Sequence, residues 1–464
     1  MTEGEPLIRA EGLEKRFSTS DGLLERLFGR GETIRAVDGV DLEIVEGETL
    51  GLVGESGCGK TTLARLLVGL DDPSAGSVDY RGSALADLGR RKRRELRTNV
   101  QYVFQNPFSS LNPQLPVGEI VGEPLEVHGI VPPDRRDDRI AELLETVGLE
   151  PAYANRYLTE FSGGQRQRIA IARALAVEPE FLVCDEPVTA LDASVQARIL
   201  NLLSDLQAEF GLSYLFVSHD LSVVEHVADR IAVMYLGRIV ERGSPIQLFE
   251  GDTHPYTEAL LSAIPEPDPL WQGDRVVLEG DVPSPADPPS GCRFHTRCPK
   301  VIPPAAYDIE SDAFRGVLSL RLDLEDAVTD GEDATDPREA LRSPVTEAAE
   351  IDRVNGNSAD FDSSDDPLLE TAAAIREAYD VPQTLADEEA DAELSSVLEA
   401  IVSGNLQTAR SRLAQAFETP CETDRPESRT VDDSGSVRHR IACHRFCDRV
   451  DDEANEALEG RERQ

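Results

Sequence analysis

A glycine-rich segment between an apolar run and a helical pattern leaves this chain few possible folds. Residues 49–53 read Thr-Leu-Gly-Leu-Val and predict a buried strand, and leucines at helical spacing follow from Leu63 to Leu70. The segment between them reads Gly54-Glu55-Ser56-Gly57-Cys58-Gly59-Lys60-Thr61-Thr62. Its glycines let backbone N–H groups surround phosphates, while Lys60 would neutralise phosphate charge and Thr61 would ligate magnesium. The pattern predicts a phosphate-binding loop between a strand and a helix.

Three further apolar runs predict strands that alternate with helices. They span residues 100–104, 181–184 and 214–217, and a helical pattern from Val195 to Leu206 separates the last two. Strands joined by helices form a parallel sheet with right-handed crossovers, so the expected fold class is α/β. Turns and helices replace the strands over about residues 107–165, which predicts a helical subdomain inserted into the core.

Two short polar motifs would complete a site beside the loop. Asp185 and Glu186 follow the apolar run 181–184, where Asp185 would join the magnesium shell and Glu186 would polarise an attacking water. Ser162-Gly163-Gly164-Gln165 precedes a predicted helix, and hydroxyl and N–H groups at a helix N-terminus bind anions. Taken alone, the acid pair could be a solvated strand end and the glycine pair a flexible turn.

These motifs stand in an order that resembles the ABC transporter ATPases, over residues 7 to about 300. The order is the phosphate loop, Gln105 in Tyr-Val-Phe-Gln-Asn-Pro, Leu-Thr-Glu-Phe-Ser-Gly-Gly-Gln, Asp185-Glu186, Ala190-Leu191-Asp192 and His219. The resemblance implies a P-loop NTPase (RecA-like) ABC cassette with a helical subdomain, and ATP and Mg²⁺ as its cofactors. It also implies that two cassettes sandwich ATP, with Ser162–Gln165 of one contacting the γ-phosphate held by the other.

The same resemblance implies roles for single residues. Gln105 would couple magnesium and the water to a membrane partner, His219 would contact the γ-phosphate, and Asp192 would join the opposing subunit. Without the family order, His219 would read as an ordinary strand-end histidine. Phe17 is the best candidate for stacking on adenine, with Phe28 as its competitor.

Four longer segments narrow the family: Gln-Asn-Pro-Phe-Ser-Ser-Leu-Asn-Pro, Cys-Asp-Glu-Pro-Val-Thr-Ala-Leu-Asp, His254-Pro-Tyr-Thr-Glu-Ala-Leu-Leu and Pro288-Pro-Ser-Gly-Cys-Arg-Phe-His-Thr-Arg-Cys-Pro. They resemble the oligopeptide/dipeptide importer ATPases, specifically the F-type subunit. The resemblance implies an ATP-hydrolysing motor at the cytoplasmic face of the membrane. It would pair with a D-type ATPase beneath two permeases and serve an external solute-binding protein. Peptides are the implied solute, and nickel or oligosaccharides, which related importers carry, are the alternatives.

The charge balance argues against nucleic acid as a partner. Acidic residues number 88 against 46 basic ones, and the formal charge is −42. A soluble ABC ATPase acting on nucleic acid or ribosomes is therefore the less favoured alternative, and the basic run Arg90–Arg97 predicts a surface helix. The chain contains no apolar run of about 18 residues, and its opening Met-Thr-Glu-Gly-Glu lacks signal-peptide features. We therefore expect the chain to stay in the cytoplasm.

The composition also predicts an adaptation to salt. Only four of the 46 basic residues are lysine. This acidic, arginine-rich composition resembles that of proteins from salt-accumulating halophiles, in which concentrated ions screen charge repulsion. The resemblance implies a source in a halophilic archaeon and instability in dilute buffer.

Composition divides the chain after the cassette. Prolines and glycines crowd residues 265–291, so we expect the compact ATPase domain, residues 1–264, to be followed by an importer-type extension over residues 265–300. Residues 301–420 hold 28 acids and eight arginines without a lysine. Helical patterns within this acidic block occur at residues 368–379, 392–402 and 406–417, with a polar loop at 355–366. The mostly helical insertion could be a binding or sensing module, or a surface extension without a ligand.

Five of the seven cysteines follow residue 290, which suggests a metal site or a redox group. Peptide-importer ATPases often end in a four-cysteine segment, and this resemblance implies a candidate [4Fe–4S] site made of Cys292, Cys298, Cys421 and Cys443. The acidic block would then be inserted between the second and third ligands, with residues 421–464 as the C-terminal cysteine-containing segment. Zinc, with His295, His439 or His444 as substitute ligands, and unliganded thiols remain alternatives. Cys447 is a spare candidate, whereas Cys58 and Cys184 are expected in the core.

Overall fold

The computed structural model describes residues 6–18, 33–106, 110–189, 191–264, 276, 278, 280–330, 367–433, 435 and 437–446. The chain forms two compact units. The first consists of residues 1–271, 284–287 and 430–441, and the second of residues 272–283, 288–429 and 442–464. Phe28, Cys447 and the expected loop at residues 355–366 lie outside the described residues.

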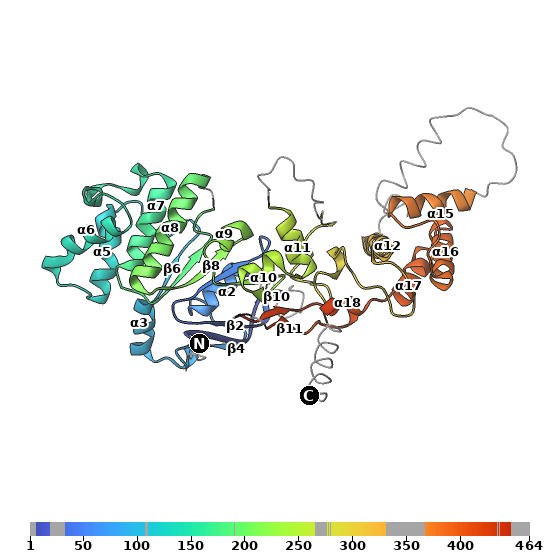
Figure 1. Cartoon of the computed structure of the whole chain (residues 1–464), viewed down its shortest axis with the longest axis horizontal. Coiled ribbons are helices and arrows are strands. Elements are labelled where there is room, and N and C mark those ends of the chain that lie inside the picture. The colour runs from blue at the N-terminus through green and yellow to red at the C-terminus, as the bar shows by residue number, and fades with distance from the viewer. Residues whose placement is uncertain are drawn as a thin grey trace, which may run out of the picture. The chain divides into compact units, whose positions relative to one another are not determined.

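An eight-stranded sheet forms the centre of the first unit, with its strands in the order β11-β12-β10-β9-β3-β8-β7-β6. Figure 1 labels β6, β8, β10 and β11 of this sheet. The five strands from β9 to β6 are parallel to one another, whereas β10 runs antiparallel to β9 and to β12. The bounds are β3 (Thr49–Val53), β6 (Val100–Val103), β7 (Phe181–Asp185), β8 (Ser213–Ser218), β9 (Arg230–Tyr235), β10 (Arg238–Gly243), β11 (Arg429–Asp432) and β12 (His439–Ile441). The four strands predicted from apolar runs are confirmed to within a residue.

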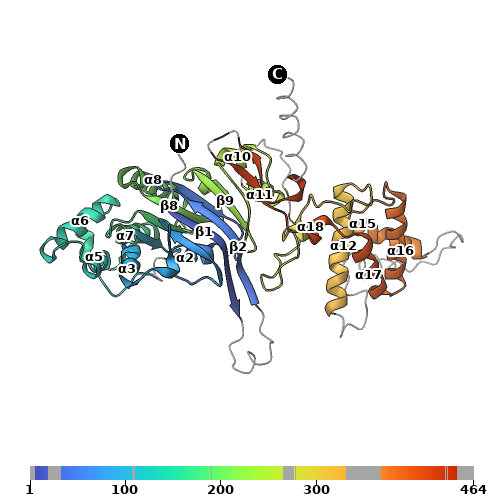
Figure 2. The ribbon, with the colours of Figure 1, turned by 90° about the horizontal axis from the view of Figure 1, so that it is seen from below.

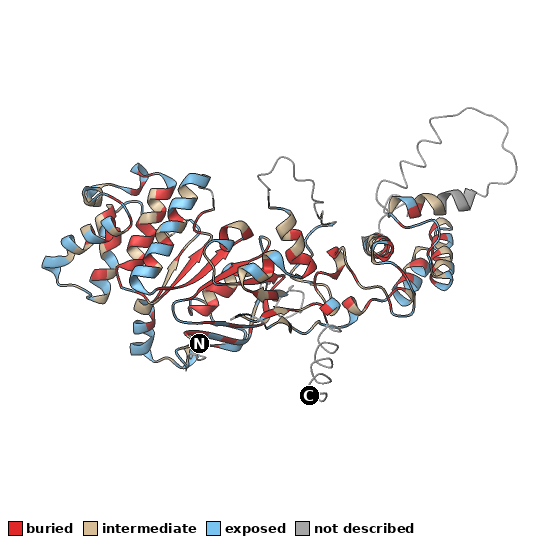
Figure 3. Cartoon of the chain, viewed as in Figure 1, coloured by how far each residue is buried: buried red, intermediate tan, exposed pale blue. Residues whose placement is uncertain are grey.

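The parallel strands are buried because helices cover the sheet. Every residue of β3, β7 and β8 is buried, and Figure 3 shows the buried residues gathered along the strands and the inward sides of the helices. The α-helices among the described residues of this unit are α2 (Lys60–Leu67), α3 (Arg90–Asn99), α5 (Val117–His128), α6 (Arg136–Thr146), α7 (Gly163–Leu175), α8 (Ala193–Phe210), α9 (Leu221–Glu225), α10 (Pro245–Glu250) and α11 (Pro255–Ser262). Helices α5, α6 and α7 pack together, as expected for a helical subdomain. The basic run forms α3, in which only Leu96 is buried.

A second, four-stranded antiparallel sheet, in the order β2-β1-β4-β5, was not predicted from the sequence. Its strands are β1 (Ile8–Ser18), β2 (Thr33–Ile44), β4 (Ala75–Tyr80) and β5 (Ser83–Ala84). The long strands β1 and β2 lie side by side, as Figure 2 shows. Register shifts interrupt the pairing of β1 with β2, so the apolar alternation that reveals a half-buried strand is broken in the sequence.

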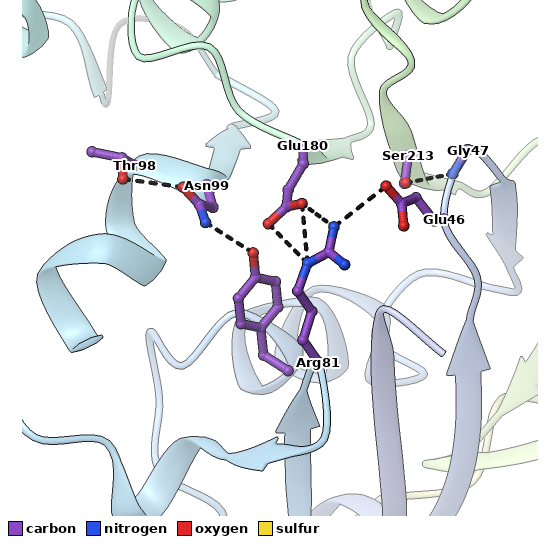
Figure 4. A network of polar contacts seen from close by, with 8 residues as sticks. Glu46, Gly47, Arg81, Thr98, Asn99, Glu180 and Ser213 are labelled. Atoms are coloured by element: carbon purple, nitrogen blue, oxygen red, sulfur yellow. Dashed lines mark hydrogen bonds and ion pairs between the residues drawn. The ribbon is translucent and has the colours of Figure 1, made fainter. Parts of the chain in front are cut away.

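Polar contacts connect the two sheets at the amino ends of the parallel strands (Figure 4). Arg81, which follows β4, forms ion pairs with Glu180 before β7 and, at 3.3 Å, with Glu46 before β3. The Nδ2 atom of Asn99 donates a hydrogen bond of 3.1 Å to the hydroxyl of Tyr80. Exposed ion pairs of this kind contribute about 1 kcal/mol or less each. They hold the edge of the sheet that lies opposite the phosphate loop.

The acidic block contains helices that pack together within the second unit. Its main helices are α12 (Ser311–Asp330), α15 (Pro367–Ala378), α16 (Glu388–Val402) and α17 (Leu406–Ala416), followed by the short α18 (Pro420–Thr423). Helix α16 packs on α15 and α17, and α12 packs on α17. The three helices predicted after residue 367 are confirmed. No helix among the described residues is both long enough and apolar enough to cross a bilayer.

The sequence predicts that the compact core ends near Ile264. That boundary concerns only the part of the core that is continuous in the chain. Residues 430–441 belong to the same unit as the cassette, because β12 pairs with β10 through Ile441 opposite Glu241 and Arg440 opposite Arg242. A three-residue strand far along the chain carries no sequence signal of its own. The core is therefore completed by a segment that the sequence places among the C-terminal cysteines.

Candidate functional site

The predicted phosphate loop joins β3 to α2, as expected. Gly54, Gly57 and Gly59 have positive φ angles, which side chains rarely adopt. Lys60 is buried, and its Nζ donates hydrogen bonds to the carbonyl oxygens of Gly54 at 2.7 Å and Glu55 at 3.0 Å. The loop therefore curls around the ammonium group of its own lysine.

Asp185 lies beside this loop, at the carboxyl end of β7. Its Oδ1 accepts a hydrogen bond from the hydroxyl of Thr61 at 3.2 Å, and its Oδ2 accepts one from the hydroxyl of Tyr102 at 2.7 Å. Burial raises the pKa of Asp185 above its ordinary value, while the two hydroxyl donors act in the opposite direction. The structure thus brings together the two residues, Thr61 and Asp185, that the sequence predicts as magnesium ligands.

Glu186 receives three hydrogen-bonding groups on one carboxylate oxygen, Oε2. Gln105 Nε2 donates at 2.7 Å and Thr189 Oγ1 at 3.2 Å, while His219 Nδ1 lies at 3.3 Å. The backbone of Glu186 has a φ of 47°, and its N–H bonds to the carbonyl of Val217 in the neighbouring strand. This constrained turn points the carboxylate toward Gln105 and His219, so three predicted site residues form one cluster.

The two remaining predicted motifs start helices. Ser162 caps α7 in a reciprocal pair with Gln165: Ser162 N donates to Gln165 Oε1 at 3.0 Å, and Gln165 N donates to Ser162 Oγ at 3.4 Å. Asp192 caps α8 by accepting from Val195 N at 3.0 Å, and a hydrogen bond from the Ser194 hydroxyl lowers the pKa of Asp192. Both helix N-termini are thus ordered within one chain.

Phe17 stands near the end of β1 with 43% of its surface exposed, and Lys15 Nζ lies 5.4 Å from the centre of its ring. An exposed ring is available for stacking. Two further residues contact the site but were missed: Tyr102 on Asp185, and Thr189 on Glu186. Tyr102 stands in the quoted segment before Gln105, where its apolar neighbours favour a core strand, and Thr189 follows Glu186 by three residues without a motif of its own.

Comparison with known proteins identifies the family. Residues 37–189 match the family model described as ABC transporter, and residues 240–304 match the one described as Oligopeptide/dipeptide transporter, C-terminal region. The chain is 51% identical over 309 residues to a Brucella ovis protein provisionally named a peptide import ATP-binding protein, covering 67% of this chain and 94% of that one. The chain belongs to the ATP-binding subunits of the oligopeptide/dipeptide ABC importers. As such it is an ATPase that couples ATP hydrolysis to transport and works with transmembrane permeases.

Two further relatives of this importer ATPase have names that specify a solute. The chain is 47% identical over 302 residues to the oligopeptide transport ATP-binding protein AppF of Bacillus subtilis, covering 64% of this chain and 91% of that one. It is 47% identical over 296 residues to the dipeptide transport ATP-binding protein DppF of Haemophilus influenzae, covering 64% and 89%. A third family model, a domain of unknown function, matches residues 311–434 and so covers most of the acidic block.

A cavity of about 440 Å³ in the importer ATPase is lined by Tyr102, whose hydroxyl bonds to Asp185, among other residues. Leu70, Leu85, Leu96 and Phe104 contribute apolar walls, and arginines of α3 also line it. Phe104 directly precedes the glutamine that contacts Glu186.

The four candidate cluster ligands, Cys292, Cys298, Cys421 and Cys443, all belong to the second unit. Cys292 N donates to the carbonyl of Cys421 at 2.8 Å, although 128 residues separate the two. Burial raises the pKa of the Cys292 thiol to about 12, and the thiols of Cys443 and Cys421 lie near enough to raise it further. Among the described residues, however, no three His, Cys, Asp or Glu side chains gather closely enough to hold a metal ion.

The three histidines proposed as substitute zinc ligands have other contacts. His295 Nδ1 lies 2.8 Å from the carbonyl of Cys292, His444 Nε2 lies 2.9 Å from that of Asp424, and His439 bonds to Glu241 in the first unit. Cys58 and Cys184 are buried in the cassette, as expected.

Proposed function

We propose that this chain is the F-type ATPase of a di- or oligopeptide importer and that Glu186 activates the water that attacks the γ-phosphate. The convergence of Gln105, Thr189 and His219 on one oxygen of Glu186, beside the phosphate loop, carries this proposal. A carboxylate fixed in this way can accept a proton from a water molecule in one defined direction. The names AppF and DppF of two relatives support the F-type assignment.

The other residues of the site would bind and orient the nucleotide. Lys60 would exchange the carbonyls of Gly54 and Glu55 for phosphate oxygens, and Phe17 would stack on adenine. Thr61 and Asp185 offer the hydroxyl and carboxylate oxygens that Mg²⁺ prefers, and the ion would neutralise phosphate charge there. His219 would lie at the γ-phosphate, and Gln105 would relate the site to the permease.

The helix caps at Ser162–Gln165 and Asp192 would serve the opposing subunit. A helix N-terminus attracts phosphate, and that of α7 is already ordered by its own capping pair. We place a D-type ATPase opposite, as in the heterodimer implied by the sequence, and a permease segment in the cavity beside Phe104. The arginines of α3 there would attract acidic residues of that segment. The chain would thus sit peripherally at the cytoplasmic face of the membrane.

This arrangement predicts that the isolated chain hydrolyses ATP weakly. Its specific activity should rise when the D-type subunit is added, because each subunit completes the other's site. Activity measured against protein concentration, with and without the partner and the two permeases in vesicles, tests the point. Peptide-loaded binding protein should stimulate the assembled complex further, whereas nickel-loaded or oligosaccharide-loaded binding protein should not. Equal specific activity under every condition would contradict the proposal that the two subunits share each site. Stimulation by the nickel-loaded or oligosaccharide-loaded binding protein alone would show that nickel or oligosaccharide, and not peptide, is the transported solute.

The C-terminal cysteines would form a [4Fe–4S] site, with the acidic helical domain inserted between Cys298 and Cys421. Four thiols of one unit, drawn from three distant stretches of chain, suit the ligand set of such a cluster. Burial raises the pKa of the Cys292, Cys298 and Cys421 thiols and so favours their protonated forms, which means that binding of a cluster would have to displace protons. The described thiols do not themselves form a closed metal site, so ligand binding would have to draw them together.

Iron and sulfide analysis after anaerobic purification should therefore find about four of each per chain. Substituting Cys421 by serine should lower both, whereas the same change at Cys184, which is buried in the cassette, should leave them unaltered. Zinc in place of iron would select the alternative metal. A metal-free protein whose second unit still unfolds cooperatively would defeat both metal assignments.

The acidic surface would be an adaptation to salt, as in proteins of halophilic archaea. A formal charge of −42 produces self-repulsion that ions screen over a few ångströms at molar concentration. The thermal unfolding midpoint should accordingly rise with potassium chloride. A midpoint that is independent of salt would remove this part of the proposal.

A further inference from the structure

A tyrosine outside the predicted site contacts the phosphate loop. Tyr256, in α11, is completely buried, and its hydroxyl accepts a hydrogen bond of 2.7 Å from the backbone N–H of Glu55. Glu55 also provides one of the two carbonyls that hold Lys60 Nζ. The ring of Tyr256 packs on Tyr235, with the ring centres 4.7 Å apart. One residue of the loop is therefore fixed from outside by Tyr256 and touches the phosphate-binding lysine from inside.

Hydrogen bonds between buried polar groups fix the position of Tyr256. Its backbone N–H donates to Nδ1 of His254 at 3.0 Å, which caps α11. Burial lowers the pKa of His254 to about 3, so the ring stays neutral and Nδ1 can accept this bond. His254 N donates to Oε2 of Glu241 at 2.9 Å, and Oε1 of Glu241 lies 2.7 Å from Nε2 of His439. Glu241, His254 and His439 are each at most 3% exposed.

His439, the last residue in this series of hydrogen bonds, comes from the C-terminal part of the chain. His439 begins β12, whose Ile441 and Arg440 pair with β10. The side chain of Gln247 in α10 fastens the same segment, because its Nε2 donates to Asp432 Oδ2 at 2.9 Å and to the carbonyl of Val437 at 3.0 Å. A strand that follows the whole acidic block is thus built into the ATPase core behind the phosphate loop.

We propose that Tyr256 is a positioning residue for the phosphate loop, and that β12 supports it through Glu241 and His439. The bond to Glu55 N fixes the first turn of the loop, against which Lys60 rests. The buried carboxylate of Glu241 fixes the start of α11 because it bonds to His254 and His439 at once. The C-terminal strand is therefore part of the ATP-binding apparatus as well as part of the sheet. This inference rests on the ATPase activity, since it concerns affinity at that site.

The substitution Tyr256→Phe removes only the hydroxyl that accepts from Glu55. We expect the full-length variant to bind a fluorescent ATP analogue about tenfold more weakly, because a hydrogen bond to a partly buried donor is lost. The KM for ATP should rise by a similar factor, while kcat at saturating ATP stays within about twofold of the wild-type value. Thr257→Val is the matched control, because its buried hydroxyl has no hydrogen-bond partner among the described residues. It should change neither parameter.

Two substitutions at His439 test the support from β12. His439→Leu removes the partner of Glu241 and should weaken ATP binding about threefold to tenfold, whereas His439→Gln, whose amide can donate to Glu241, should restore most of the affinity. A purely structural role would lower the unfolding midpoint of all these variants without changing KM. Wild-type affinity in Tyr256→Phe or in His439→Leu, measured below the unfolding midpoint, overturns the corresponding part of the proposal. A wild-type chain that binds no ATP would overturn the ATPase activity and this inference together.

Discussion

Replacing Glu186 by glutamine should lower steady-state ATP hydrolysis about a thousandfold and leave ATP binding intact. The amide keeps an oxygen for the hydrogen bonds from Gln105 and Thr189, so the cluster need not rearrange. It cannot accept a proton from the attacking water. Binding should survive because Lys60 and the backbone of the loop, which we propose to hold the phosphates, do not depend on Glu186. The variant should therefore accumulate with its partner as an ATP-bound dimer.

Phosphate release in molar salt with magnesium, together with the mass of the complex in solution with and without ATP, measures both effects. Glu225→Gln is the matched control: the same chemical change is made on an exposed side chain of α9, whose Oε2 lies 4.0 Å from Nδ1 of His226. It should hydrolyse ATP at the wild-type rate. Turnover in Glu186→Gln at the level of this control would remove Glu186 from its proposed role, and loss of ATP binding would show that it supports the loop instead.

The chemical motifs could be predicted from the sequence because each is a local signal. The loop from Gly54 to Thr62 follows β3, and the pair Asp185–Glu186 stands at the end of β7. Both strands are buried along their whole length, so an apolar run marks each strand and polar residues mark its end. The carboxyl ends of neighbouring parallel strands meet at one edge of the sheet. Local patterns together with this rule bring Thr61 near Asp185, and Gln105 near Glu186.

The contacts that support those motifs could not be predicted, because they join residues distant in the chain. Tyr102 reaches Asp185 across 83 positions, and Tyr256 reaches Glu55 across 201. Tyr102 lies within an apolar run and is therefore expected in the core, and the sequence neighbours of neither tyrosine indicate which polar group its hydroxyl will contact. The same holds for β12, whose position in the sheet depends on pairing with β10.

The acidic block shows a different limit. Apolar spacing predicts α15, α16 and α17 but not α12, and buried Leu394, Val397, Leu398 and Ile401 of α16 lie on the inward side as that spacing requires. The charge composition does not predict that some arginines of the acidic block are buried. Arg321 is almost fully buried and forms ion pairs with Glu325 within α12 and with Glu422, and the second pair joins α12 to the segment of Cys421. Composition alone assigns charged residues to the protein surface, although charged residues that form ion pairs can be buried in the core.

Replacing Gly59 by alanine should lower the affinity for ATP by about a hundredfold or more. Gly59 precedes α2 with a φ of 109°, and a Cβ placed there would lie 2.1 Å from the carbonyl oxygen of Ala36 in β2. A backbone atom cannot move aside as a flexible side chain can, so the loop itself must shift. The strained φ and the steric conflict together cost about 3 to 5 kcal/mol, most of which falls on the geometry that surrounds the phosphates.

Gly47→Ala separates the two causes, because Gly47 also has a positive φ, 76°, but a Cβ there would meet no atom within 4 Å. This control should lose about 1 kcal/mol of folding free energy from backbone strain alone and bind ATP as the wild type does. Binding of the fluorescent ATP analogue and thermal unfolding should be measured on both variants. If Gly59→Ala binds ATP within a few-fold of Gly47→Ala, the loop can shift away from Ala36 without losing its phosphate contacts. The close approach of β2 to the loop would then play no part in shaping the nucleotide site.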